Sequence, residues 1–372
     1  MTRPTRTTGC FAVIGGGGTG GHVQPALAVG RALVDAGHDR VSIHFVGSRR
    51  GLERRLVPEA GFAITLLPGR GIARHLTVDN VGAAWGVAAA VVQAVGVMRR
   101  LRPAVALSVG GYAGLPVALA AVVCRVPLVL AEQNAVPGAA NRLTGRFARA
   151  AAVSFAGTAL PRAVVTGNPL RPEILEVDTS PEGRAKARVD LGLPEGRTVV
   201  AAFGGSLGSG TINAAARGLA ELWRDRDDLA IYHVVGRRDW GSAAGPGPGP
   251  LLYRTVEYED RMPLLLAAAD VAVCRSGGSV AELAAVEVPS VLVPLPGAPG
   301  DHQRANAMAF VDRGAAVLVP DAECTAPRLA EVLGALIGES GRLNAMSSAA
   351  AGLARPDAAA RVVDLLERHA RV

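Results

Sequence analysis

A glycine-rich segment that ends in a histidine contains the first residues of this sequence that could do chemistry. Residues 15–22 read GGGGTGGH, and an Ala/Leu/Val pattern with helical spacing follows. Glycines at the start of a helix let backbone N–H groups and the positive helix end approach an anion or a sugar oxygen. Histidine ordinarily has a pKa near neutrality, so a residue such as His22 can accept a proton from a reacting hydroxyl group. The alternative for His22 is a capping or packing role.

Four further clusters of glycine and polar residues follow apolar runs that are typical of strands. In an open parallel α/β sheet such clusters lie at the carboxyl ends of the strands, where ligands bind. Within residues 274–283, Glu282 lies in the first turns of a predicted helix. Its carboxylate could accept two hydrogen bonds from a ribose diol, or it could simply complement the helix dipole. The four clusters occupy residues 108–114, 131–142, 274–283 and 300–307.

Two common nucleotide sites and two kinds of cysteine site do not fit these clusters. A dinucleotide-binding fold places an acidic residue at the tip of its second strand, but the second strands here end in FVGSRRGLE and VVGRRDW. The lysine of a P-loop is also missing. Cys10, Cys124, Cys274 and Cys324 are scattered without the spacing of a zinc site or of a disulfide framework. We therefore expect neither an NAD-dependent enzyme nor a P-loop ATPase.

Strands that alternate with helices are predicted to position the clusters. Alternation of this kind is typical of α/β proteins with parallel, doubly wound sheets. The segments FAVIGGGGTGG and VVAAFGGSLGSG each end a strand in a glycine loop and start a helix, which predicts two similar Rossmann-like domains. The predicted strands are residues 10–16, 41–47, 63–69, 104–111, 127–133, 151–157, 198–205, 229–236, 270–278, 289–295 and 315–320.

The domain boundary is predicted between residues 166 and 172, where proline, glycine and charge replace the strand pattern. A chain of 372 residues is long enough for two domains, each with its own core. We expect an N-terminal, membrane-associating domain at 1–166 and a C-terminal domain at 167–350. A last helix within 351–372 is expected to pack back on the N-terminal domain.

Composition and charge limit the class of protein and the kinds of partner that it could bind. Hydrophobic residues make up 49% of the chain and charged residues 19%, which excludes a disordered protein. Residues 1–102 contain thirteen arginines and five acidic residues, so the basic excess lies in the first quarter of the chain. Such a region implies an anionic partner, which could be a membrane surface, a nucleic acid or a phosphorylated substrate. The uncharged runs at 80–98 and 103–124 approach membrane-spanning length, but we interpret them as a helix and as a strand, loop and helix.

The motifs together resemble a known family. GGTGGH, GGY, EQN, GNPLR, GGSLG, CRSGG…AE and DHQ…NA occur in this order between residues 11 and 307. This set is similar to the MurG family of peptidoglycan glycosyltransferases. The resemblance implies the GT-B fold, with two Rossmann-like domains facing across a cleft. It also implies inverting transfer of N-acetylglucosamine from UDP-N-acetylglucosamine to the C4 hydroxyl of lipid I, which yields lipid II, without a tightly bound metal or other cofactor.

The resemblance assigns most of the donor site to the second domain. Ser206 and Arg171 correspond to residues that meet the diphosphate, Glu282 to the ribose-binding acid and Gln303 to the reader of the sugar hydroxyls. Residues 258–262 correspond to a segment whose backbone holds uracil. No Asp-x-Asp pair lies near this predicted nucleotide site, so helix N–H groups and Arg171 would stabilise the leaving UDP. From the first domain, the residues that correspond to the lining near the donor sugar are Thr19, Gly20, Gly21 and Asn134.

The resemblance assigns the acceptor site to the first domain. Its loops would offer backbone N–H groups to the acceptor pyrophosphate, from Gly17 and Gly18 in one loop and from Gly110, Gly111 and Tyr112 in another. His22 is the expected catalytic base. Glu132 is the competing base or a residue that orients the acceptor, and His302 is a weaker candidate.

The acceptor of this family carries a polyprenyl tail, so we expect a peripheral protein on the cytoplasmic face of the cell membrane. Basic residues beside apolar ones can hold a helix on anionic lipid, although a core helix with a solvated basic end is the alternative for this segment. The expected partners are UDP-N-acetylglucosamine, lipid I, an anionic membrane surface and proteins of cell division or cell-wall synthesis, with no nucleic acid. Other possible functions are a GT-B natural-product glycosyltransferase, a UDP-sugar epimerase or a non-catalytic division scaffold. The candidate membrane segment contains Arg70, Arg74, Leu76, Val81, Trp85, Arg99, Arg100 and Arg102.

Overall fold

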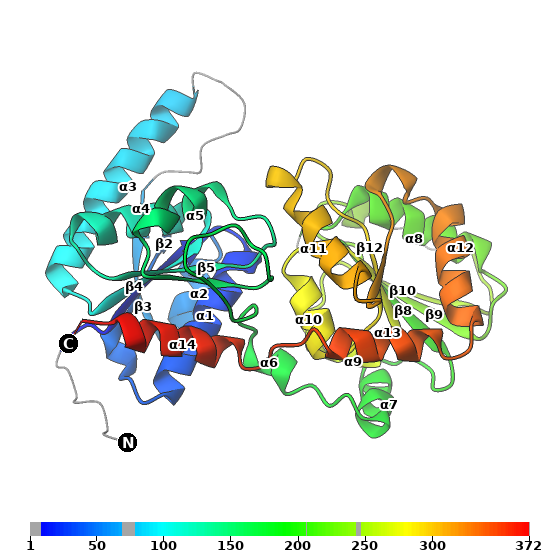
Figure 1. Cartoon of the computed structure of the whole chain (residues 1–372). Helices are drawn as coiled ribbons and strands as arrows, with labels where there is room; N and C mark the ends of the chain where they lie inside the picture. Colours follow the sequence, from blue (N-terminus) through cyan, green and yellow to red (C-terminus); the bar gives the residue numbers. More distant parts are fainter. Residues whose placement is uncertain (1–8, 69–78, 206, 243–246, 372) are drawn as a thin grey trace. The chain divides into compact units, whose positions relative to one another are not determined.

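The computed structural model describes residues 9–68, 79–205, 207–242 and 247–371 (Figure 1). The chain divides into two compact units. Unit 1 comprises Met1–Arg171 and Arg355–Val372, and unit 2 comprises Pro172–Ala354. These divisions lie a few residues after those expected from the sequence. The last segment of the chain thus belongs to the same unit as the first.

Unit 1 contains a seven-stranded parallel sheet with the order β3-β2-β1-β4-β5-β6-β7. The order of the strands reverses between β1 and β4, so this is the topological switch point of the sheet. The glycine loop after β1 lies there, where open α/β sheets bind ligands. The strands are β1 (Ala12–Gly17), β2 (Ile43–Ser48), β3 (Ala63–Leu67), β4 (Val105–Gly110), β5 (Leu128–Glu132), β6 (Ala150–Val153) and β7 (Ala163–Val165).

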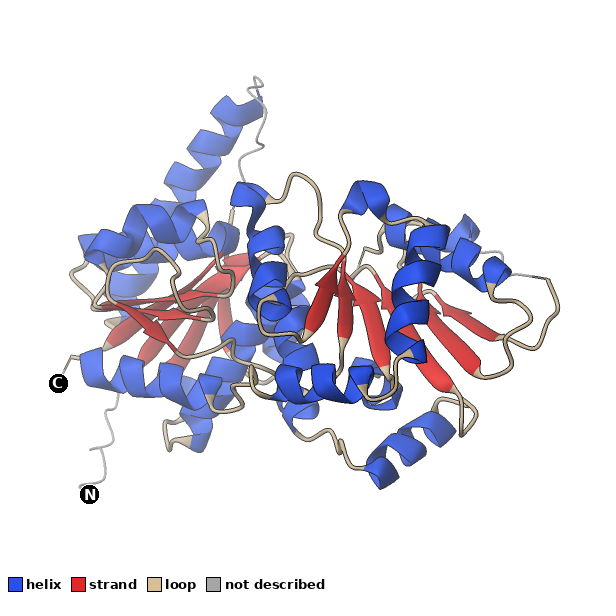
Figure 2. Cartoon of the chain, turned by 45° about the vertical axis from the view of Figure 1, so that its right-hand side comes forward, coloured by secondary structure: helices blue, strands red, loops and turns tan. Residues whose placement is uncertain are grey.

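Helices cover both faces of this sheet (Figure 2). Alternate strand residues face opposite sides, so Ile14 packs in a cluster with residues of α1 and α14, whereas Val13 packs with residues of α3 and α4. In α14, Val362 and Leu366 are buried in the first of these clusters, which joins the end of the chain to unit 1. The helices are α1 (Gly20–Asp35), α2 (Glu53–Glu59), α3 (Asp79–Leu101), α4 (Gly111–Val123), α5 (Ala139–Thr144) and α14 (Ala358–His369), with short 3-10 turns η1 (Arg40–Ser42) and η2 (Gly145–Phe147).

Unit 2 contains a six-stranded parallel sheet with the order β10-β9-β8-β11-β12-β13. Its strands are β8 (Thr198–Phe203), β9 (Leu229–Val234), β10 (Leu252–Val256), β11 (Val271–Cys274), β12 (Ser290–Leu292) and β13 (Ala316–Leu318). The α-helices are α6 (Pro172–Leu175), α7 (Pro181–Asp190), α8 (Gly210–Leu222), α9 (Met262–Ala268), α10 (Ser279–Ala285), α11 (His302–Val311), α12 (Ala326–Gly338) and α13 (Arg342–Ala351). The 3-10 turns are η3 (Trp240–Ser242), η4 (Pro299–Asp301) and η5 (Asp321–Glu323).

The long helix α3 was one of the two uncharged runs that approach membrane-spanning length. Among the described residues, none of the helices is both long enough and apolar enough to span a bilayer. Ala94 and Met98 of α3 are buried against unit 1, whereas Trp85 is 76% exposed and Val92 is 73% exposed. Arg70, Arg74 and Leu76 of the candidate membrane segment lie outside the described residues, as does the side chain of Val81.

Candidate active site

The glycine loop of unit 1 connects β1 directly to α1. Gly18 has a φ of +99°, a conformation that glycine adopts without a steric penalty. Thr19 follows in an extended conformation as the N-cap residue of α1, and its side chain does not cap the helix. Instead, Thr19 Oγ1 lies 3.2 Å from His22 Nδ1. The loop therefore presents the first N–H groups of α1, and it includes the predicted site residues Gly20 and Gly21.

His22 lies against the glycines that precede α4. A Cβ built on Gly110 would lie 3.5 Å from Cδ2 and Nε2 of the imidazole, and one on Gly111 would lie 3.4 Å from Cγ and Nδ1. Both glycines have positive φ, of 81° and 70°. A Cβ on Gly111 would also overlap the carbonyl oxygen of Gly17, with which Gly111 forms an isolated β-bridge. The structure thus brings the predicted base together with both predicted acceptor loops.

Tyr112, the next residue of this loop, is half-buried. Its hydroxyl group donates to the carbonyl oxygen of Pro68 at 2.7 Å. Burial raises the pKa of the Tyr112 phenol above its ordinary value. The side chain therefore connects α4 to the segment after β3. The contribution predicted for Tyr112 at the acceptor site would come from its backbone N–H group.

Glu132, the alternative base, ends β5 and is 4% exposed. Its Oε1 atom accepts from the backbone N–H and the side-chain amide of Asn134, at 3.1 and 3.2 Å. Its Oε2 atom accepts from Gly138 N–H and from the Asn141 amide, both at 2.9 Å. Four donors surround this carboxylate, an arrangement that favours a role in holding the 133–141 loop over proton transfer.

A second buried carboxylate, Glu53, lies beneath the glycine loop and was not among the predicted site residues. Its two oxygens accept from the backbone N–H groups of Gly18 and Ser48. The tip of the second strand carries no acid, as we inferred, but Glu53 reaches that tip from the next helix. The signal in the sequence was the series of glycines around it, since Gly17, Gly47 and Gly51 have no space for a Cβ beside this side chain.

In unit 2, the loop after β8 corresponds to the GGSLG motif. Ser206 lies outside the described residues. Ser209 caps α8, with its side chain accepting from Ile212 N–H. Gly208 and Gly236 have positive φ, and a Cβ on Gly236 would overlap the backbone of Gly208. Close packing of these two loops explains why glycine follows both β8 and β9.

Arg275 connects the carboxyl ends of several strands of unit 2. Its guanidinium group donates to Ser209 Oγ at 2.7 Å and to the carbonyl oxygens of Val293 and Pro294, both at 3.1 Å. It also forms a 2.6 Å ion pair with Asp321, and its side chain is only 11% exposed. A planar group with several fixed donors is suited to such a junction. Arg275 belongs to the CRSGG…AE motif, but no role was predicted for it.

The segment after Arg275 and the start of α11 are joined by hydrogen bonds. Ser276 Oγ donates to the Gln303 carbonyl oxygen at 2.7 Å, and the Asn306 amide donates to the Ser276 carbonyl oxygen at 3.0 Å. The Gln303 side chain accepts from Leu295 N–H at 2.9 Å. The segment after Arg275 leads into the short helix α10, and half-buried Glu282 lies in the first turn of that helix. The CRSGG…AE and DHQ…NA motifs therefore lie together in unit 2. His302 in α11 contacts the Pro299 carbonyl oxygen through Nδ1.

The segment at 258–262 is held by a buried carboxylate of its own. Glu259 accepts from the hydroxyl group of Tyr232 at 2.5 Å and from Arg261 N–H at 2.8 Å. Arg171, predicted to meet the donor diphosphate, ends the first segment of unit 1, whereas Glu282 and Gln303 belong to unit 2. Among the described residues, there is no group of three or more His, Cys, Asp or Glu side chains that could hold a metal ion.

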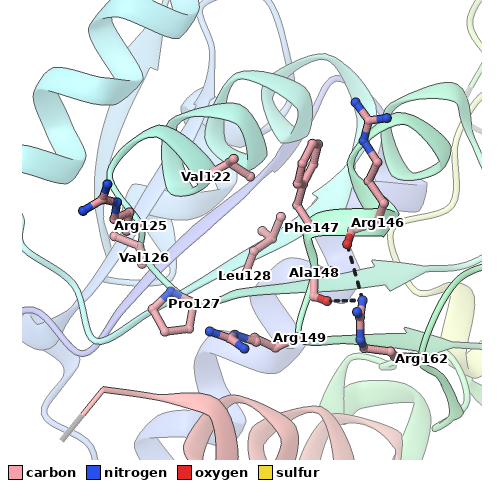
Figure 3. Close-up of a pocket in the computed structure, with 10 residues that line it drawn as sticks. All are labelled: Val122, Arg125, Val126, Pro127, Leu128, Arg146, Phe147, Ala148, Arg149 and Arg162. Atoms are coloured by element: carbon pink, nitrogen blue, oxygen red, sulfur yellow. Dashed lines mark hydrogen bonds between the residues drawn. The ribbon is translucent and has the colours of Figure 1, made fainter.

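A pocket of about 490 Å³ in unit 1 lies away from these motifs (Figure 3). It opens near the amino ends of β5, β6 and β7, the sheet edge opposite to the glycine loops. Arg162 lines the pocket and donates to the carbonyl oxygens of Arg146 and Ala148. The side chains in Figure 3 include none of the predicted site residues, so the pocket is not the predicted active site.

Two parallel-sheet α/β units, each with glycine loops at the carboxyl ends of its strands, define the chain as a GT-B protein. Residues 12–153 match the glycosyltransferase family 28 N-terminal domain, and residues 199–362 match the C-terminal domain of that family. The chain belongs to glycosyltransferase family 28 and, within it, to the MurG family.

Relatives across nearly the full length support this membership. The chain is 37% identical to the UDP-N-acetylglucosamine–N-acetylmuramyl-(pentapeptide) pyrophosphoryl-undecaprenol N-acetylglucosamine transferase of Desulforudis audaxviator, over 96% of this chain and 97% of that protein. It is 40% identical to the protein of the same name from Acidothermus cellulolyticus, over 96% and 97% of the two chains. The crystal structure of Acinetobacter baumannii MurG matches with a TM-score of 0.74 and 28% identity, over 96% of this chain and 99% of that one.

The kitacinnamycin glycosyltransferase structure shares only the fold, at 18% identity and a TM-score of 0.72, over 97% of this chain and 99% of that one.

Proposed function

We propose that this protein transfers N-acetylglucosamine from UDP-N-acetylglucosamine to N-acetylmuramyl-(pentapeptide) pyrophosphoryl-undecaprenol, the conversion of lipid I to lipid II in peptidoglycan synthesis. The observation that carries this proposal is full-length similarity, at 37–40% identity, to enzymes named for that reaction. The C4 hydroxyl of the acceptor attacks the anomeric carbon of the donor with inversion, UDP leaves, and the hydroxyl proton passes to a base.

We assign the base to His22. Its imidazole lies at the start of α1 beside Thr19 and the glycines of α4, and a neutral imidazole can accept a proton from a hydroxyl group. Glu132 has hydrogen bonds from four donors, which supports a positioning role for it. Asn134, which would line the site near the donor sugar, is one of the residues that Glu132 holds.

The acceptor pyrophosphate is assigned to the N-terminal ends of α1 and α4. The first turn of α1 contains no acidic residue that would compete with an anionic ligand. Gly20 and Gly21 begin α1, so their N–H groups have no partners within the helix. Gly110 is the N-cap residue of α4 and Gly111 is its first residue, and both lie beside His22. Fixed backbone donors of this kind suit a diphosphate.

The UDP-sugar is assigned mainly to unit 2. Glu282 would accept hydrogen bonds from the ribose diol, and Gln303 would read the sugar hydroxyl groups. Ser209 and Arg275 support this assignment, because their hydrogen bond fixes the start of α8 beside the GGSLG loop that contains Ser206. Arg171 would neutralise charge on the diphosphate as UDP leaves.

An enzyme whose acceptor is a lipid must act at the surface of the bilayer. We therefore assign peripheral membrane association to unit 1. The exposed Trp85 and the arginines at the end of α3 support it, since an aromatic side chain and basic residues together favour anionic membrane surfaces.

Radiolabelled transfer to a short-chain lipid I analogue in EDTA tests the proposed reaction. We expect labelled disaccharide product with UDP-N-acetylglucosamine and undiminished turnover without free divalent metal. Replacing the acceptor with soluble aglycones tests the natural-product alternative, and incubating the UDP-sugar alone tests epimerisation. Product in either of the last two reactions, with none on the lipid analogue, would overturn the proposal.

A further inference from the structure

Glu53 is a buried carboxylate that connects two loops of unit 1. Glu53 is the first residue of α2, and it is only 1% exposed. Oε2 accepts from Gly18 N–H at 2.9 Å, and Oε1 accepts from Ser48 N–H at 2.6 Å. A carboxylate is rarely buried unless such donors compensate its charge. One oxygen accepts from the loop after β1 and the other accepts from the end of β2, so the carboxylate connects these two segments.

Three glycines leave the space that this side chain occupies. A Cβ built on Gly17 would overlap the Glu53 carboxylate, as would one on Gly51, and one on Gly47 would overlap Cγ. These residues come from the end of β1, from β2 and from the segment before α2. Three separate segments therefore lack side chains at the places where they pass this one carboxylate.

We propose that Glu53 is a positioning residue for the acceptor half of the reaction. By holding Gly18 in its positive-φ conformation, it sets the path of the chain into Thr19, the N-cap residue of α1. That path determines the direction of the N–H groups of Gly20 and Gly21 and the position of the His22 side chain. The inference rests on the proposed function, because that function makes this loop the acceptor site.

Glu53 also changes which N–H groups serve the acceptor. The sequence analysis assigned Gly18 to the acceptor pyrophosphate, but in this structure its N–H donates to Glu53. The negative charge below the loop also disfavours a second anion on that side of Gly18. The pyrophosphate is thereby directed to the start of α1 and to Gly110 and Gly111.

The substitution Glu53→Gln tests this role with nearly unchanged side-chain size. A glutamine amide has one acceptor oxygen, so it cannot accept from Gly18 and Ser48 through two separate oxygens as the carboxylate does. Glu59→Gln is the matched control, because Glu59 ends the same helix, carries the same charge and forms only an exposed pair with Arg55.

Two measurements are made on the full-length protein. The first is amide hydrogen exchange of peptides spanning residues 12–22, which needs no substrate. The second is steady-state transfer with separate titrations of the lipid I analogue and of UDP-N-acetylglucosamine. For Glu53→Gln we expect exchange in the loop and the acceptor KM each to rise roughly tenfold, the loss expected for one charge-assisted hydrogen bond. The donor KM should stay within about twofold, and Glu59→Gln should match the wild type.

A merely structural role gives a different result. If Glu53→Gln lowered the melting temperature and kcat while both KM values stayed unchanged, or if loop exchange matched that of Glu59→Gln, the proposal would be overturned. A wild-type protein that transfers no sugar to lipid I would refute the proposed function. In that case faster loop exchange in Glu53→Gln would still establish the bridge but not its role in acceptor binding.

Discussion

The imidazole of His22 lies against Gly111, where a Cβ would be 3.4 Å from the ring atoms Cγ and Nδ1. Thr19 Oγ1 lies 3.2 Å from the same Nδ1 atom. The two contacts hold the ring between the starts of α1 and α4. Replacing either partner should therefore affect proton transfer more than folding.

His22→Ala should lower kcat by about 10²- to 10⁴-fold, the range for losing a general base. Binding of UDP-N-acetylglucosamine should stay unchanged, because His22 belongs to the acceptor unit. Steady-state kinetics and isothermal titration calorimetry measure these two effects. His302→Ala is the control, since His302 contacts only a backbone carbonyl oxygen through its Nδ1 atom. Wild-type turnover in His22→Ala would exclude it as the base.

Gly111→Ala should impair transfer, because the new methyl group would overlap the Gly17 carbonyl oxygen and separate the two acceptor loops. Gly37→Ala provides a matched comparison: Gly37 also has a positive φ, of 100°, but nothing lies within 4 Å of its Cβ position. Both variants carry about 1 kcal/mol or more of backbone strain. We expect only Gly111→Ala to raise the acceptor KM by tenfold or more in transfer assays. Equal KM values in the two variants would contradict this arrangement.

Glu282→Ala should weaken UDP binding by roughly 10- to 100-fold, the loss expected for hydrogen bonds to a charged group. Calorimetric titration with UDP measures the affinity without catalysis. Glu331→Ala removes a carboxylate that pairs on the surface with Arg328, and it should leave the affinity unchanged. Unaltered UDP affinity in Glu282→Ala would refute the assignment to ribose.

The stability of unit 2 should fall as the pH drops from about 6.5 to about 4. Burial lowers the pKa of His233 to about 4, with a smaller contribution from Arg217. Its neutral ring contacts Asn213 through Nε2 and Tyr253 through Nδ1. Because the unfolded chain takes up a proton near pH 6.5 and the folded chain does not, the stabilisation present above that pH is lost on acidification, by roughly 3 kcal/mol in all.

Urea unfolding monitored through the fluorescence of buried Trp223 measures this pH dependence. His233→Gln should be less stable than the wild type at pH 7, because glutamine fits the network poorly. The difference between the two proteins should shrink toward pH 4.5, where only the wild-type histidine is penalised. A difference that stays constant with pH would contradict a neutral buried imidazole.

Much of the fold was predictable from local patterns. The predicted strands at 10–16 and 104–111 correspond to β1 and β4, because buried parallel strands form continuous apolar runs. Strands β7 and β10 were not among the predicted strands. Ala163–Val165 is short and exposed, and Leu252–Val256 is only partly buried. Edge strands of this kind lack the continuous apolar signal on which the prediction relied.

The sequence by itself determined the class of protein, since seven motifs in a fixed order identify the family without any coordinates. It also indicated the glycine loops and His22, because backbone exposure and imidazole chemistry are properties of single residues. Only the tertiary structure decided how the carboxylates are used. Motif position singled out Glu132 and not Glu53, yet both are buried carboxylates that accept hydrogen bonds from backbone or amide donors. The environment of a charged group depends on which segments the fold brings around it, and local sequence does not specify that.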